Sequence, residues 1–194
     1  MPAPSRLSRT ASAIATVAAA LAFMALSAAS YAPLWERAFR SDASPVSWLS
    51  SALLLTLAGM SLRLMADGGL PRALGTWVAA AMFLLALDEQ FMWHELWKYR
   101  CHEWTALCRF DTMRELPMLA VAGVGTLTIA ILHRTMGAGL SRTLLWAGLA
   151  VGLWAITVDQ VAMPWPIAEL EEGFEVLAEA LVLAAFISLP PWHA

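Results

Sequence analysis

Long apolar runs alternate with short polar connections along the whole chain. Six of these runs cover residues 12–31, 48–66, 75–97, 116–133, 143–163 and 167–189. Each is close to the ~20 residues that a helix needs to cross the hydrocarbon core of a bilayer. The pattern predicts an all-α fold, a polytopic membrane helix bundle with six transmembrane helices, as a single integral membrane domain over residues 1–194.

The first apolar run has an alternative interpretation as a signal peptide. Arg6 and Arg9 precede an alanine-rich stretch, and the small residues at 27–29 or 30–32 resemble a cleavage site. The run is as long as a true span, which favours its retention. Cleavage would leave five transmembrane helices.

Composition supports the membrane assignment and removes one class of partner. Hydrophobic residues make up 60% of the chain and charged residues 14%, whereas a soluble domain carries about 25% charged residues. The lipid bilayer is therefore the first expected partner. The net charge of −3 and the lack of a cluster of basic residues argue against nucleic-acid binding.

An unusually polar stretch ends the third run. Asp88, Glu89, Gln90, His94 and Glu95 follow a long apolar segment. Ionisable side chains in a membrane segment are costly unless paired, so they indicate function by default. If one helix continues from 75 to 97, Asp88 and Glu95 lie on one face at i and i+7.

Two later runs carry acids towards the same side of the membrane. Asp159 lies near the end of the fifth run, and the sixth begins with acids at 169, 171, 172, 175 and 179. Since consecutive helices alternate in direction, the acids of the third, fifth and sixth helices are expected at similar depth near one face. We predict that they form one site.

The residue types favour a metal-binding or acid–base site that acts on a membrane-soluble substrate. Helix bundles build di-iron and di-manganese centres from carboxylates and imidazoles. The predicted metal ligands are Asp88, His94, Glu95, Glu172 and Glu175, with iron, manganese or zinc as the divalent metal. His94 is the candidate general base, and Asp159 would orient a water or the imidazole. The Glu-x-x-His spacing typical of di-iron bundles is missing.

Two other classes of function remain open. The same acids would serve a proton- or cation-coupled transporter, as intramembrane acids do in pumps. In a non-catalytic membrane subunit they would tie helices together, for example Glu95 with Lys98, or Glu175 with Arg109 or Arg114.

The two cysteines bear on orientation. Basic residues divide six against six between the two faces, so their count gives no orientation, but Arg6 and Arg9 favour a cytoplasmic N-terminus in a bacterial inner membrane. The loop with Cys101 and Cys108 would then face an oxidising compartment, where a disulfide can form. Two unpaired thiols remain the alternative, and the spacing matches no standard zinc motif.

The acidic motifs also carry a resemblance. The motifs are Asp88-Glu89 with His94-Glu95, and Glu171-Glu172 with Glu175. In these positions the chain resembles bacterial multi-helix membrane proteins that have no assigned activity. The resemblance implies a helical membrane bundle and no particular reaction. Residues 114–118 are slightly similar to the alkaline ceramidase group of membrane hydrolases, but the closing pair of histidines on a late helix is missing, which excludes that group.

Overall fold

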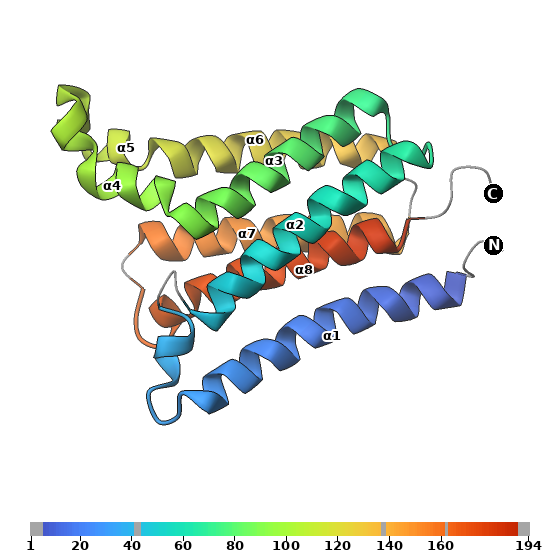
Figure 1. Cartoon of the computed structure of the whole chain (residues 1–194), viewed down its shortest axis with the longest axis horizontal. Helices are drawn as coiled ribbons and strands as arrows, with labels where there is room; N and C mark the ends of the chain where they lie inside the picture. Colours follow the sequence, from blue (N-terminus) through green and yellow to red (C-terminus); the bar gives the residue numbers. More distant parts are fainter. Residues whose placement is uncertain (1–5, 41–43, 137–138, 162, 190–194) are drawn as a thin grey trace.

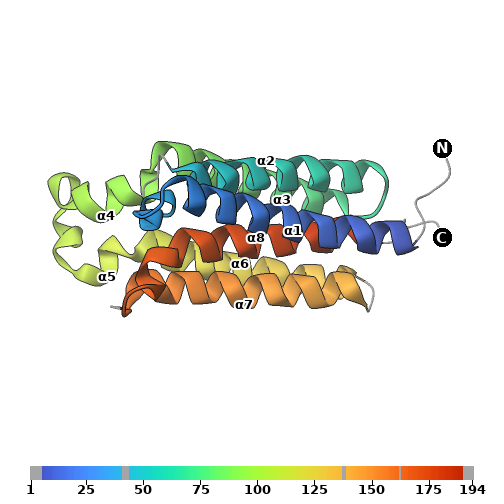
Figure 2. The ribbon, with the colours of Figure 1, turned by 90° about the horizontal axis from the view of Figure 1, so that it is seen from below.

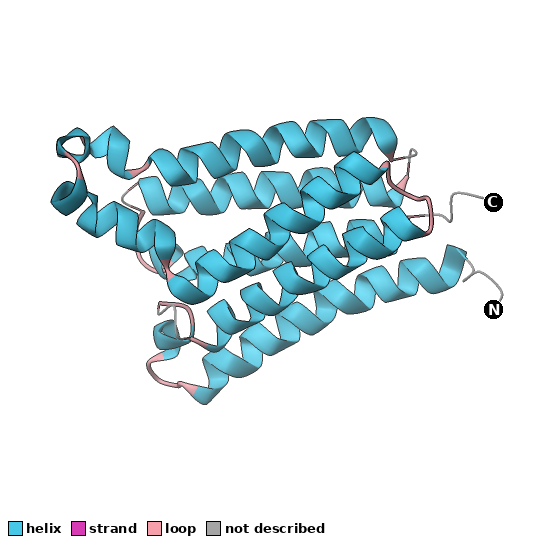
Figure 3. Ribbon diagram, turned by 45° about the horizontal axis from the view of Figure 1, so that its top comes forward, coloured by secondary structure: helices cyan, strands magenta, loops and turns pink. Residues whose placement is uncertain are grey.

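A computed structural model describes residues 6–40, 44–136, 139–161 and 163–189 as a bundle of helices (Figure 1). The α-helices are α1 (Arg6–Ser30), α2 (Pro45–Ala66), α3 (Arg72–Phe91), α4 (Trp93–Trp104), α5 (Asp111–Arg114), α6 (Leu116–Thr135), α7 (Leu140–Gln160) and α8 (Glu171–Ile187). Three 3₁₀ turns join them, η1 (Trp35–Ala38), η2 (Ala106–Arg109) and η3 (Ile167–Leu170). No strand occurs within these ranges, so the all-α prediction is confirmed (Figure 3).

Five of the helices are long and apolar enough to cross a membrane. They are α1, α2, α3, α6 and α7. By the length and composition of these helices the chain is a multi-pass helical membrane protein. The sixth predicted run, 167–189, is divided, because its first turn is the 3₁₀ turn η3 and α8 has only 17 residues.

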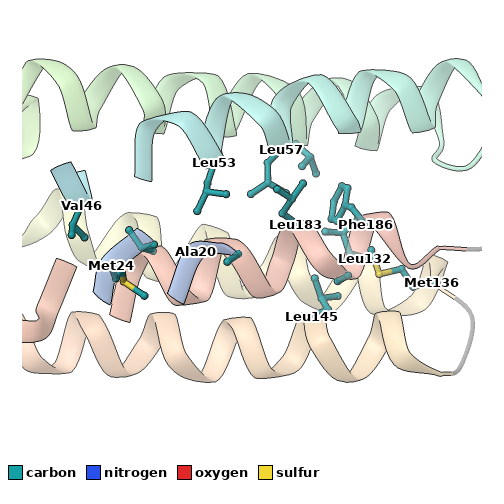
Figure 4. Close-up of a cluster of buried hydrophobic side chains, with 14 of the residues drawn as sticks. Ala20, Met24, Val46, Leu53, Leu57, Leu132, Met136, Leu145, Leu183 and Phe186 are labelled. Carbon is teal, nitrogen blue, oxygen red and sulfur yellow. The ribbon is translucent and has the colours of Figure 1, made fainter. Parts of the chain in front are cut away.

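Helix α8 occupies the middle of the bundle. It packs against α1, α2 and α7 (Figure 2), whereas α3 packs on α2, and α6 packs on α7. The core close-up shows Leu53 and Leu57 of α2 turned towards Leu183 and Phe186 of α8 (Figure 4). This apolar contact fixes the depth and rotation of α8.

A glycine lets α7 approach α8 closely. A Cβ added at Gly148 would lie 2.7 Å from Val182 Cγ2 and 3.0 Å from the carbonyl oxygen of Ala178. Small residues at such crossings allow two helix backbones to pack without a side chain between them.

The third predicted helix, 75–97, is not continuous. Helix α3 ends at Phe91, Met92 adopts the left-handed conformation (φ 53°, ψ 42°), and α4 begins at Trp93. Oδ1 of Asp88 accepts a hydrogen bond from the His94 backbone N–H (3.0 Å), so the last turn of α3 supplies the side-chain cap of α4. The prediction that Asp88 and Glu95 share one helical face was wrong, because the chain turns between them.

The start of α1, the α2–α3 connection, the end of α6, the start of α7 and the end of α8 lie at one end of the bundle, on the right of Figure 1. The opposite end holds η1, the last turn of α3, α4, the end of α7, η3 and the start of α8. We call this second end the polar end.

Candidate functional site

A cavity of about 240 Å³ lies at the polar end. Seven acids line it: Glu89, Glu95, Asp159, Glu169, Glu171, Glu172 and Glu175. Arg40, Lys98, His94 and Tyr99 are the other lining residues with a titratable side chain. We call this space the acidic cavity. It takes residues from α3, α4, α7 and α8, so segments far apart in the sequence meet there.

Three glutamates form the tightest group in the cavity. Glu89 extends from the last turn of α3, and Glu172 and Glu175 share one face of α8 because they are three residues apart. One carboxylate oxygen from each lies within 4.8 Å of the other two, and all three residues are partly buried. Such a spacing suits three oxygen ligands around one divalent cation.

A buried hydroxyl continues this group towards the middle of the bundle. Ser50 of α2 is fully buried, and its Oγ donates to Glu179 Oε1 (2.7 Å) and also lies 3.3 Å from Glu89 Oε1. Next to it, Gln90 Nε2 donates to Ser51 Oγ (2.8 Å). Helix α2 thus supplies the polar partners that an acid inside the bundle requires.

His94 is held by Asp88. Its Nδ1 lies 2.8 Å from Asp88 Oδ2, and the imidazole is about three-quarters buried. The hydrogen bond to Asp88 raises the pKa of His94, burial opposes the rise, and the charges of Asp88, Glu89 and Glu95 add to it. Asp88 is not among the residues that line the cavity, and its contacts make it the residue that positions His94.

Lys98 of α4 joins three elements. Its Nζ lies 2.8 Å from Asp159 Oδ1 and 3.7 Å from Glu115 Oε2. Burial lowers the pKa of Lys98, but the hydrogen bond and charge of Asp159 outweigh burial, so the pKa is raised. Gln160 Nε2 completes the network by donating to Asp159 Oδ2 (2.7 Å) and Glu115 Oε2 (2.8 Å). In this network Asp159 is a helix-tying group.

The second cation of the cavity is also paired. Arg40 Nε lies 2.6 Å from Glu169 Oε2, which fastens the segment after η1 to η3. Arg114 is not among the residues that line the cavity, and its Nε donates to the carbonyl oxygen of Cys108 (3.2 Å). Among the described lining residues, seven acids thus face two cations and one histidine. Buried like charges repel strongly, so this excess calls for protons or for a bound cation.

The structure brings most of the sequence-predicted site residues together. His94, Glu95, Asp159, Glu172 and Glu175 all line the acidic cavity. Asp88 reaches it only through His94. The sequence prediction omitted Glu89 from the ligand set, although Glu89 belongs to the tight group of three. Glu89 stands beside Asp88 in the same polar stretch, and the rotation of the last turn of α3 decides which of the two lines the cavity.

Cys101 and Cys108 are joined by a disulfide, with their Cα atoms 5.8 Å apart. Both cysteines are buried. The bond fastens the last turn of α4 to η2. It therefore stabilises the helix that carries His94 and Lys98.

Comparison of the chain with protein-family models, with curated proteins and with solved structures finds no match. The acidic cavity is therefore the feature on which a functional assignment depends.

Proposed function

We propose that the acidic cavity binds a divalent cation through Glu89, Glu172 and Glu175. The observation that supports this most is the approach of their three oxygens to within 4.8 Å inside a partly buried site. Three carboxylates at this spacing repel one another when ionised, and a shared divalent cation removes the repulsion. Carboxylate ligands favour manganese and magnesium, and an added imidazole would suit iron or zinc.

His94 fits the surroundings of such an ion. A metal-binding histidine ordinarily donates its second ring nitrogen to a carboxylate, which fixes the ring and makes it more basic. The contact between His94 Nδ1 and Asp88 Oδ2 has this form and leaves Nε2 for an ion or a substrate. We propose that His94 is the ligand or general base of the site, and that Asp88 orients it.

The reaction class that follows is metal-assisted acid–base chemistry on a membrane-soluble substrate. Three protein ligands leave coordination positions for water or a substrate oxygen. We place the polar end at the exoplasmic surface of a bacterial inner membrane, because the Cys101–Cys108 disulfide persists in an oxidising compartment. Arg6 and Arg9 would then lie on the cytoplasmic side.

One observation favours cation or proton transport as a second candidate. Glu179 lies two turns along α8 from Glu172, and Ser50 connects it to Glu89. Its Oε2 is buried without a hydrogen-bond partner among the described residues. Transport predicts cation-coupled proton flux in liposomes that is lost in Glu179→Gln, whereas a surface-restricted metal site predicts no flux.

Manganese titration tests the leading proposal. We expect the protein in lipid nanodiscs to bind one Mn²⁺ per chain, measured as loss of the free-ion electron paramagnetic resonance signal. Glu172→Gln and Glu175→Gln should each weaken binding by at least about tenfold, since each removes a ligand. The matched control is Glu103→Gln, an exposed glutamate of α4 paired with Arg100 outside the cavity.

Equal Mn²⁺ affinity in wild type, Glu172→Gln and Glu175→Gln would refute the metal site. Loss of thermal stability in these variants without any Mn²⁺ binding in the wild type would instead identify the acids as ties between helices. That result would support the non-catalytic alternative.

A further inference from the structure

A second hollow, of about 250 Å³ and almost entirely apolar, lies beside the acidic cavity. It runs between α1 and α8 and is lined by Leu21, Met24 and Ala25 of α1 and by Gly173, Phe174 and Leu177 of α8. We call it the apolar groove. Since α1 is long and apolar enough to span a membrane, lipid hydrocarbon chains would be the apolar molecules next to this groove in a bilayer.

Phe39 is common to the apolar groove and the acidic cavity. Its side chain is buried, and its ring rests on Gly173, where an added Cβ would lie 3.2 Å from Phe39 Cε1. Glu172 precedes Gly173 in the same turn of α8, and it lines the acidic cavity. One aromatic ring and one helical turn therefore separate an apolar space from an acidic one.

Charge defines the head group that this arrangement fits. Even with a divalent cation on the three glutamates, the seven lining acids outnumber the positive charges of the ion, Arg40, Lys98 and a protonated His94. A positively charged head group is attracted to this excess, and a phosphate is repelled.

We propose that the two spaces form one binding site for an amphiphile, with its hydrocarbon chain in the apolar groove and an ammonium head group in the acidic cavity. This proposal deepens the proposed function, on which it rests for the cavity's role, by naming the substrate class. Ligand sites of this kind combine a mostly apolar wall with a few polar groups that set the orientation. Phe39 lies where the chain meets the head group.

Photolabelling tests the site with three probes of equal chain length. Each carries a diazirine near the end of a twelve-carbon chain, and the head is ammonium, phosphate or absent. The protein is held in phosphatidylcholine nanodiscs, and labelled peptides are identified by mass spectrometry. We expect the ammonium probe to label segments 21–28 and 170–177 about tenfold more than the headless probe, and the phosphate probe to gain nothing.

Two tryptophan substitutions on α1 provide the matched pair. Ala25→Trp fills the apolar groove and should abolish the ammonium-dependent labelling. Ala19→Trp adds the same side chain at an exposed position outside the groove and should leave the labelling unchanged. Thermal melting of both variants shows that each is folded.

Equal labelling by all three probes would overturn the proposal, because it would show ordinary lipid contact. Stronger labelling by the phosphate probe, or cross-links from the groove to a second copy of the chain, would also overturn it. Mn²⁺ titration of the same samples separates the two proposals. Manganese binding without selectivity for ammonium refutes the amphiphile site alone, and selective labelling without manganese binding refutes the metal site alone.

Discussion

Helices α6 and α8 relate polarity to burial in the opposite way to the helices of a soluble protein, in which the more polar helix is the more exposed one. In α6 no charged side chain precedes the last turn, yet Leu132 is its single buried residue. In α8 four glutamates interrupt the first half, yet α1, α2 and α7 enclose it. Its buried residues are Val176, Ala178, Ala180, Leu183, Ala184, Ala185 and Phe186. The more polar helix is the central one.

The contrast follows from the solvent. Lipid tails are as apolar as leucine, so burying α6 would gain little from the hydrophobic effect. A glutamate that faces lipid costs several kcal/mol, whereas one inside the bundle finds partners such as Ser50. The central position of α8 therefore gives its acids polar partners, and the acidic cavity lies where these acids gather.

The largest effect is expected from placing a carboxylate on α6, where it would face lipid. Val124 lies half exposed near the middle of α6. Val124→Glu should cost roughly 2.5–3.5 kcal/mol of insertion free energy, because α6 offers the carboxylate to lipid. An insertion assay that compares the fraction of inserted chains with that of Val124→Leu measures the cost. Insertion of Val124→Glu as efficient as that of Val124→Leu would break the contrast between α6 and α8.

The second largest effect is expected from replacing a glycine at the contact between α7 and α8, compared with a glycine on α6. Gly148→Val forces a side chain against Val182 and the Ala178 carbonyl, so we expect a loss of about 2 kcal/mol in the free energy of unfolding. A Cβ added at Gly125 on α6 would meet no atom within 4 Å, so Gly125→Val should be nearly neutral. Denaturant unfolding in mild detergent measures both variants. Comparable losses in the two would show that α6 is packed as tightly as α8.

The smallest predicted effect depends on pH and lies at the junction between α3 and α4. The folded-state pKa of His94 is raised, so its hydrogen bond with Asp88 stabilises the fold fully below the unfolded pKa of 6.5 and is lost as pH rises through the folded pKa. Asp88→Asn should therefore lower the melting temperature most at pH 6 and progressively less above it. Melting curves of the metal-free protein between pH 6 and 9 test this, with Glu103→Gln as control. A deficit that grows with pH would contradict it.

Much of the architecture follows from the apolar runs, because a bilayer demands helices of nearly fixed length. The break at Met92 could not be predicted in the same way. A left-handed residue is usually glycine or asparagine, and no such residue marks the end of α3. The cap that Asp88 gives to α4 stabilises the break, and it depends on a tertiary arrangement that a sequence pattern does not contain.

The candidate site was predictable in kind but not in detail. Depth along the helices indicated that the acids of the third, fifth and sixth runs would meet, and the cavity contains residues from all three. The choice of Glu89 over Asp88 depends on the rotation of the last turn of α3. The pairing of Arg40 with Glu169 depends on how the segment after η1 folds back. Neither the rotation of that turn nor the path of that segment produces a periodic pattern in the sequence.

Cadmium bridging between α3 and α8 tests the central claim most directly. In the double variant Glu89→Cys with Glu175→Cys, two thiols replace carboxylates whose oxygens lie within 4.8 Å. The account predicts that this variant, in nanodiscs, binds one Cd²⁺ at least about tenfold more tightly than either single variant, since only the pair supplies two thiolate ligands. Cd²⁺ affinity of the double variant no greater than that of the single variants would contradict the meeting of these two helices in one site.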